Sequence, residues 1–222
     1  MVNAIIFDFD GVVLESLNVK TNAFKKLYEP YGSDISKRVV EHHLENGGVS
    51  RFDKIKFYHN IFLGEDIDEK KIQKIAQKFS EMVMNEIMKV PFVDGAKQFL
   101  EDNYKRYLMF ISSATPTNEL NFICKQRKIA KYFQGIFGSP DSKSKHISSI
   151  MTNYSLNNRE IVFIGDSSSD LDAANTHNLT FIARLSGVSN NLVNEKYTLS
   201  DLNKLGRIIS IINNNTQRHV LK

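Results

Sequence analysis

A chain of 222 residues with 41% hydrophobic and 24% charged residues has the composition of a globular protein, with room for one core and a smaller appended domain. Its 29 basic and 25 acidic residues give a net charge of +4, without an arginine-rich arm, so we expect no nucleic-acid partner. A single cysteine excludes an internal disulfide, and no apolar run approaches the roughly 18 residues of a membrane span, so we expect a cytoplasmic protein without membrane contact.

Short apolar runs alternate with helical patterns, which predicts a parallel sheet with helices between its strands. A terminal amphipathic helix is predicted over Leu202–Ile212, followed by a polar segment that we expect to fray. We therefore expect an α/β fold with a Rossmann-like parallel sheet. The predicted strands are, in chain order, Ala4–Phe7, Tyr107–Ile111, Gly135–Phe137, Ile161–Ile164 and Phe181–Ala183.

The first two predicted strands are separated by a gap too long for a single crossover helix. Apolar residues recur in it at steps of three and four between Ile72 and Ile87, which predicts a helix with Asp66 or Asp68 at its N-cap. The segment 91–95, Pro-Phe-Val-Asp-Gly, marks the return to the sheet. We therefore predict a helical cap over residues 15–90, inserted into an α/β core formed by residues 1–14 and 91–222.

Two pairs of aspartates follow predicted strands near opposite ends of the chain. Asp8 and Asp10 end the first strand and, two residues apart, face one side if the strand geometry persists. Asp166 and Asp170 follow the fourth strand. Desolvated carboxylates are costly unless a cation neutralises them, and carboxylate oxygens are ligands that Mg²⁺ favours. The two pairs therefore predict one magnesium-centred site for phosphoryl chemistry.

Two other segments supply groups that can hold a phosphate. Ser112 and Ser113 end the second predicted strand, where hydroxyl and backbone N–H groups can contact phosphate oxygens. A lysine is also required, because a phosphate dianion among four aspartates is too negative for one Mg²⁺. Lys143 is our choice and Lys145 the alternative, while His146 is expected to begin a helix rather than to act in catalysis.

In this order the motifs resemble those of the haloacid dehalogenase superfamily, within which the chain is most similar to members of the β-phosphoglucomutase and phosphoglycolate phosphatase type. The family's helical cap also follows its first motif, as the inserted helices do here. The resemblance covers nearly the whole chain. The motifs read Asp8-Phe9-Asp10-Gly11-Val12, then Ser112, Lys143, and Gly165-Asp166-Ser167-Ser168-Ser169-Asp170.

The resemblance implies a Mg²⁺-dependent phosphatase. Asp8 would attack phosphorus and form an aspartyl-phosphate, and Asp10 would protonate the leaving oxygen and later activate water. Asp8, the backbone carbonyl of Asp10 and Asp166 would hold Mg²⁺, with Asp170 bound directly or through water. Ser112, with Ser113 beside it, and Lys143 would hold the transferred group.

One cap segment, Asn46–Arg51, resembles the substrate-specificity loop of β-phosphoglucomutase-like members, which carry a similar Gly-Val-Ser-Arg. This implies that Arg51 binds a phosphate or carboxylate of the substrate. The alternative is a loop arginine paired with Glu45 or Asp53. Those mutases carry a histidine where this chain has Lys20, which we expect to be a solvated helix lysine.

The favoured function is hydrolysis of a small phosphorylated metabolite, a sugar phosphate or phosphoglycolate-like monoester. The first alternative is a sugar phosphomutase of the β-phosphoglucomutase type. The second, from another class, is a non-catalytic regulatory or binding protein that keeps the fold. We expect a monomer or a homodimer.

Overall fold

The computed structural model describes residues 1–186 and 192–220, with the side chains of the last helix described as far as residue 215. Within these residues the core is a six-stranded parallel sheet in the order β3-β2-β1-β4-β5-β6. The Rossmann-like α/β fold is therefore confirmed. The strands are β1 (Ala4–Phe7), β2 (Leu108–Pro116), β3 (Gly135–Ser139), β4 (Ile161–Gly165), β5 (Thr180–Arg184) and β6 (Thr198–Leu199).

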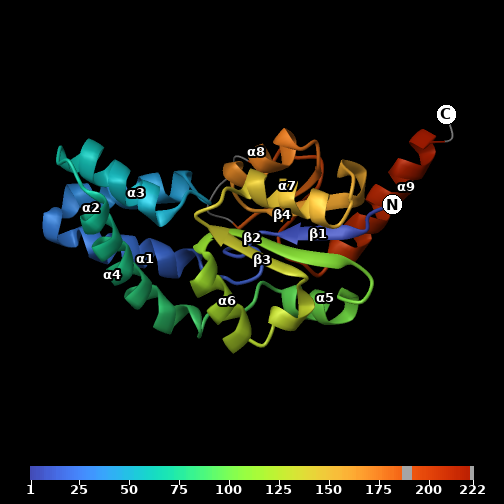
Figure 1. Ribbon diagram of the computed structural model, residues 1–222, viewed down its shortest axis with the longest axis horizontal. Coiled ribbons are helices and arrows are strands. Elements are labelled where there is room, and N and C mark those ends of the chain that lie inside the picture. Colours follow the sequence, from blue (N-terminus) through green and yellow to red (C-terminus); the bar gives the residue numbers. More distant parts are fainter. Residues whose placement is uncertain (187–191, 221–222) are drawn as a thin grey trace.

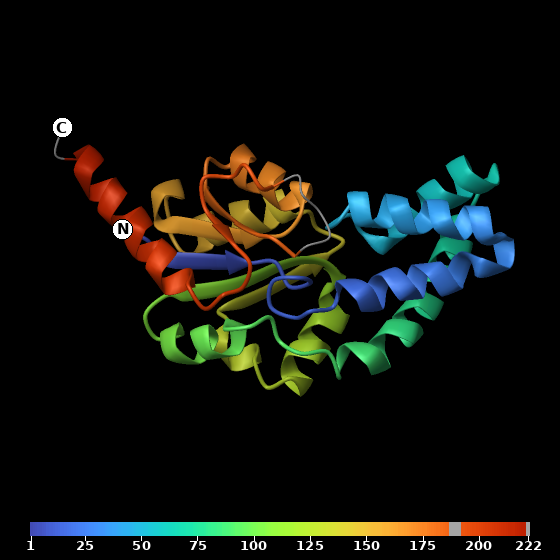
Figure 2. The same cartoon turned by 180° about the vertical axis from the view of Figure 1, so that it is seen from behind.

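Helices cover both faces of the sheet, so its central strands are apolar on both sides (Figure 1). In β1, Ile5 and Phe7 pack into the hydrophobic cluster on one face, while Ala4 and Ile6 pack into the cluster on the other. Figure 2 shows the same layers from behind. The covering helices are α5 (Ala96–Asn103), α6 (Thr117–Gln126) and α9 (Leu205–Val220) on the first face, and α7 (Lys143–Asn153) and α8 (Ser168–Thr176) on the second.

The structure extends several of the predicted elements. Strand β2 continues past Ile111 to Pro116, because the hydroxyl residues after Ile111 are buried and stay in the sheet although they break the apolar run. Helix α9 continues through Val220, where the sequence predicted a frayed polar segment after Ile212. The two-residue strand β6 was missed, since so short a run carries no periodic signal.

The segment between β1 and β2 forms a helical cap at one end of the sheet, with both termini at the other end (Figures 1 and 2). Phe24 is at the centre of its core, with ring centroids 4.4 Å from Phe79 and 5.7 Å from Tyr58. Asp68 caps the last cap helix by accepting from the backbone N–H of Lys71. The cap elements are α1 (Leu17–Tyr28), α2 (Ser33–Glu45), α3 (Arg51–Phe57) and α4 (Glu69–Ile87), with a short 3-10 helix, Glu29–Tyr31, and a short π-helix, Tyr58–Leu63.

The two chain segments that connect the cap to the core lie side by side. The backbone N–H of Glu15 donates to the carbonyl of Pro91 at 3.0 Å, and that of Val93 donates to Val13 at 3.0 Å. The guanidinium of Arg127, which directly follows α6, donates to three carbonyls at the end of α4 and just beyond it. The cap is thereby joined to the core through a narrow, hydrogen-bonded connection.

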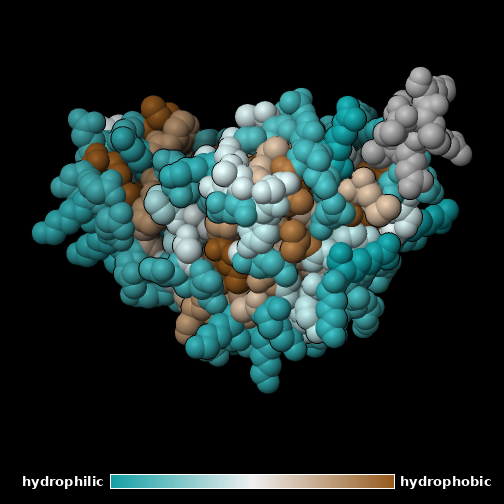
Figure 3. Space-filling model, turned by 45° about the vertical axis from the view of Figure 1, so that its right-hand side comes forward, coloured by the Kyte–Doolittle hydropathy of each residue, from teal (hydrophilic) through white to brown (hydrophobic). Residues whose placement is uncertain are grey.

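None of the helices among the described residues combines the length and the apolar character that crossing a bilayer requires. On the face shown in Figure 3, hydrophilic side chains predominate and the hydrophobic ones form scattered patches.

Replacing Phe163 with alanine tests the sheet core. Phe163 lies on the central strand β4, is fully buried and packs edge-on against Phe181. We expect Phe163→Ala to destabilise the protein by about 3–5 kcal/mol and lower Tm by about 6–20 °C, because it leaves a cavity. The control is Phe122→Ala on α6, where the side chain is 49% exposed and the loss should be within about 1 kcal/mol. Equal losses in thermal melting would contradict this account of the core.

Candidate active site

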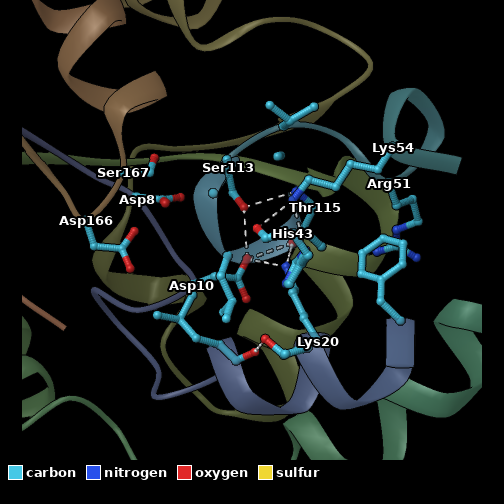
Figure 4. A pocket seen from close by; sticks show the side chains of 18 of the residues that line it. Asp8, Asp10, Lys20, His43, Arg51, Lys54, Ser113, Thr115, Asp166 and Ser167 are labelled. Atoms are coloured by element: carbon cyan, nitrogen blue, oxygen red, sulfur yellow. Dashed lines mark hydrogen bonds and ion pairs between the residues drawn. The ribbon is translucent and has the colours of Figure 1, made fainter. Parts of the chain in front are cut away.

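A pocket lies between the cap and the carboxyl ends of the central strands, which is where parallel α/β sheets bind ligands. Figure 4 shows Asp8, Asp166 and Ser167 on one side, Lys54 and Arg51 on the other, and Asp10 between them. The acidic side comes from the loops after β1 and β4, and the basic side comes from the cap. The lining residues from the core include Asp8, Asp10, Ser113, Ala114, Thr115, Asp166, Ser167 and Ser168.

Three of the four predicted aspartates form a buried cluster. Carboxylate oxygens of Asp8, Asp166 and Asp170 all lie within 4.8 Å of one another. Burial, reinforced by the charge of Asp170, raises the pKa of Asp8 to about 7. Burial and the charge of Asp8 likewise raise the pKa of Asp166 well above its ordinary range. The repulsion within this oxygen-only donor set fits a hard divalent cation such as Mg²⁺.

Two glycines allow these carboxylates to come together. Gly11 has a φ of +77°, and a Cβ there would lie 2.1 Å from Oδ2 of Asp166. A Cβ at Gly165 would lie 2.3 Å from the Cβ of Asp170. Any side chain at either position would push an aspartate out of the cluster, which explains why a glycine accompanies the acids in both motifs.

Lys143 provides a positive charge inside the acidic cluster. Its Nζ lies 3.2 Å from Oδ2 of Asp8 and forms an ion pair with Asp170. Burial alone would lower the pKa of Lys143, but the charges of Asp170 and Asp8 outweigh burial and raise it. The alternative, Lys145, pairs with Asp141 at 2.7 Å and has a side chain that is 65% exposed. Of the two lysines, the structure therefore brings Lys143 into the site.

The two predicted serines point to different places. Ser113 lines the pocket, with its Oγ 3.4 Å from Oδ2 of Asp10. Ser112 is fully buried, with its Oγ 2.9 Å from Nδ1 of His146, and is not among the residues that line the pocket. The structure thus does not place the Ser112 side chain where the sequence predicted it, because neighbouring strand residues face opposite sides. His146 lies on helix α7, contacts Ser112 and is not among the residues that line the pocket.

The carboxylate of Asp10 turns away from the acidic cluster toward the cap. It forms an ion pair with Lys20, whose side chain is only 14% exposed, and accepts hydrogen bonds from Ser16 at 2.6 Å and Thr115 at 3.0 Å. Burial would raise the pKa of Asp10, but Lys20 and these hydroxyls together lower it. The expectation of a solvated Lys20 is wrong. Lys20 shares a helix face with Leu17, which also lines the pocket, but the sequence does not show that this face points to the core.

Arg51 is already paired in this structure. Its guanidinium donates to both carboxylate oxygens of Glu119 on the core helix α6, at 3.0 and 2.7 Å, and also contacts Ser80. Its predicted alternative partner Asp53 instead bonds Ser50 at the start of α3. The predicted local pair is not formed, because a buried guanidinium needs a carboxylate and Glu119 of the core supplies one. Arg51 also lines the pocket, so its contact with a substrate stays a prediction.

The glycine loop before α3 lies directly against the acidic cluster. Ser169 donates to the carbonyl of Gly47 at 3.1 Å. A Cβ at Gly48, where φ is +76°, would lie 2.0 Å from Oγ of Ser169 and 3.1 Å from Nζ of Lys143. The cap is therefore closed onto the core in this structure, and small residues in the loop make that approach possible.

The motif order, the cap and this geometry agree with a comparison of the sequence with known families. The family described as haloacid dehalogenase-like hydrolase matches residues 5–184. The chain belongs to this hydrolase family. The resemblance predicted from the four motifs is thereby confirmed for the family. No curated protein matched the sequence.

Solved structures share the fold of this family member over nearly its whole length. A β-phosphoglucomutase from Clostridium difficile superposes with a TM-score of 0.79 at 20% identity, covering 100% of both chains. A protein described as a predicted phosphoglycolate phosphatase from Haemophilus somnus 129PT gives 0.74 at 17% identity, covering 94% of this chain and 98% of its own. The HAD-hydrolase YfnB from Bacillus subtilis, solved bound to magnesium, gives 0.71 at 16%, covering 94% and 99%. At these identities the likeness shows the fold alone.

Removing the charge of Asp8 should change how stability depends on pH. The pKa of Asp8 is about 7 in the fold against its ordinary 3.8, so the folded state binds that proton more tightly. Without divalent cations, the stability it contributes is therefore present below about pH 4 and is lost as pH rises through about 7. We expect Asp8→Asn to exceed wild type in Tm by a margin that grows over this interval. A margin independent of pH, measured by calorimetry in chelator, would contradict the raised pKa.

Proposed function

We propose that this protein is a Mg²⁺-dependent phosphatase that hydrolyses small phosphomonoesters through an aspartyl-phosphate on Asp8. The observation that carries the proposal is the contrast between two nearby carboxylates. Asp8 lies among acids beside Lys143, whereas Asp10 is held apart by Lys20 and Thr115. Two acids in such different surroundings suit two roles, a nucleophile and a proton carrier.

The proposed reaction has two halves. In the first, an oxygen of Asp8 bonds to phosphorus, the ester P–O bond breaks, and the leaving oxygen takes a proton from Asp10. In the second, water bonds to phosphorus and gives a proton to Asp10, and the P–O bond to Asp8 breaks to release phosphate. Both aspartates are then back in their starting forms.

The remaining residues of the site bind and neutralise the phosphoryl group. Lys143, 3.2 Å from Asp8, and the hydroxyl of Ser113, which lines the pocket, would contact its oxygens. Asp8, Asp166 and Asp170, with the backbone carbonyl of Asp10, would hold Mg²⁺. When bound, the ion would offset the charge that develops on the phosphoryl oxygens.

Hydrolysis is favoured over the two alternatives by residues of this chain. β-Phosphoglucomutase-like members carry a histidine at the position of Lys20, and Lys20 here pairs with Asp10. This chain therefore lacks a residue that is associated with the mutase reaction. A non-catalytic role would leave the nucleophile and the proton carrier without a purpose, yet both are buried in the pocket.

Asp8→Asn tests the nucleophile. We expect Mg²⁺-dependent phosphate release from a panel of phosphomonoesters, and a loss of about 10³-fold or more in kcat in the variant, because the attacking oxygen is removed. The matched control is Asp172→Asn, an exposed aspartate on α8, which should keep wild-type activity. Isomerised product instead of phosphate, with a sugar 1-phosphate and its bisphosphate, would establish the mutase alternative, and no turnover of any substrate would establish the non-catalytic one.

Lys20→Met tests how Asp10 is tuned. The first half-reaction needs protonated Asp10, and Lys20 lowers the pKa of that carboxyl, so Lys20 keeps the alkaline limit of kcat/KM low. Removing the ammonium raises the pKa of Asp10 and should move the alkaline limb of the pH profile to higher pH. A lower rate with an unmoved limb would show that Lys20 acts on something other than the proton of Asp10.

A further inference from the structure

Three cations of the cap line the pocket, and two of them are already neutralised. Lys20 is paired with Asp10, and Arg51 is paired with Glu119. Among the residues that the structure describes, Lys54 forms no ion pair with a carboxylate. Lys54 is therefore the cap cation that still lacks an opposite charge.

Lys54 is also one of the most buried polar residues of the protein, with an exposed fraction of 2%. Its Nζ lies 2.9 Å from Nδ1 of His43 and donates to the carbonyl of that residue at 3.4 Å, with the ring of Phe24 5.9 Å away. A buried ammonium without a counter-ion is costly. An anionic group of a ligand in the pocket would supply the missing charge.

His43 orients the ammonium group of Lys54 without adding a charge of its own. Burial and the neighbouring Lys54 lower the pKa of His43 to about 2, so its ring is neutral and adds no competing charge. A neutral ring nitrogen can accept from the lysine and hold the direction of its Nζ. The aromatic rings of Phe24 and Phe79, with centroids 4.4 Å apart, line the same pocket, and Lys54 itself is almost completely shielded from solvent.

We infer that Lys54, oriented by His43, binds a second oxyanion on the leaving-group side of the substrate. The substrate class is then a phosphomonoester that carries another acidic group, a carboxylate or a second phosphate. This rests on the proposed phosphatase function, because it places the phosphoryl group at Asp8 and the second charge at the cap end. Asp8 and Lys54 line the same pocket, and Figure 4 shows them on its opposite sides.

Matched substrate pairs test the inference. The first pair is 2-phosphoglycolate and 2-hydroxyethyl phosphate, and the second is glucose 1,6-bisphosphate and glucose 1-phosphate. We expect wild type to prefer the doubly acidic member of a pair by about 10- to 100-fold in kcat/KM, the effect of one charge-assisted contact. Preference in the first pair assigns a carboxylate, and preference in the second assigns a phosphate. No preference in either pair overturns the inference.

Variants of α3 identify the residue responsible. Lys54→Met should abolish the preference, since it keeps the volume of the side chain and removes its charge. Lys54→Arg should keep part of it. The matched control is Lys56→Met, an exposed lysine two residues away, which should keep all of it. A preference that survives in Lys54→Met overturns the assignment.

The pH dependence of the preference gives a second readout. Burial, with the charges of Lys20 and Lys143 and against that of Asp10, lowers the pKa of Lys54 to about 7. The ammonium is lost as pH rises through this value, so the preference should decline above about pH 7 in wild type and persist in Lys54→Arg, whose guanidinium stays charged. Parallel profiles in the two proteins contradict a role for the lysine charge.

Binding separates a failure of this inference from a failure of the phosphatase proposal. In the Asp8→Asn background, where turnover is blocked, 2-phosphoglycolate or glucose 1,6-bisphosphate should raise Tm more than its partner, and Lys54→Met should remove the difference. If that holds while wild type releases no phosphate from any substrate, the anion site stands and the phosphatase proposal fails. If wild type releases phosphate without preference, the phosphatase proposal stands and the anion site fails.

Discussion

The repulsion among three buried carboxylates is the constraint on which the rest of this site depends. Asp8, Asp166 and Asp170 are brought within reach of one another by the carboxyl ends of two adjacent central strands. Lys143 offsets part of their charge, and the raised pKa of Asp8 shows that it does not offset all of it. A further cation would stabilise the ionised form of the cluster, and the proposed Mg²⁺ would supply that charge.

The cap divides its cations among different tasks. Lys20 lowers the pKa of Asp10 and holds its carboxylate apart from the acidic cluster, so two carboxylates close in the sequence have different surroundings. Arg51 joins the cap to Glu119 of the core, which makes it a contact of the closed arrangement. Of these three, Lys54 faces the pocket without a carboxylate partner, so the residue proposed to select the substrate differs from the one that joins cap and core.

Much of the fold was predictable because apolar runs and acidic turns are local signals. The central strands β1 and β4 are uniformly buried, so each appears in the sequence as a continuous apolar run that can be recognised without the tertiary structure. Strand β2 was predicted too short, and Ser112 was chosen with Ser113 beside it, because the run of hydroxyl residues does not reveal which of them faces the pocket. The shifted register of β2 against β3 between Ser112 and Pro116 makes that direction still harder to infer.

The sequence by itself determined the family, the inserted cap, and the aspartates and lysine that meet at the end of the sheet, since strand ends and motif spacing are local features of the sequence. Only the tertiary structure decided what the long cationic side chains bind. Lys20 meets Thr115, and Arg51 meets Glu119, across 95 and 68 positions of the chain. Each flexible side chain can reach several partners, and the partner is selected by burial and charge balance, which exist only once cap and core are packed together.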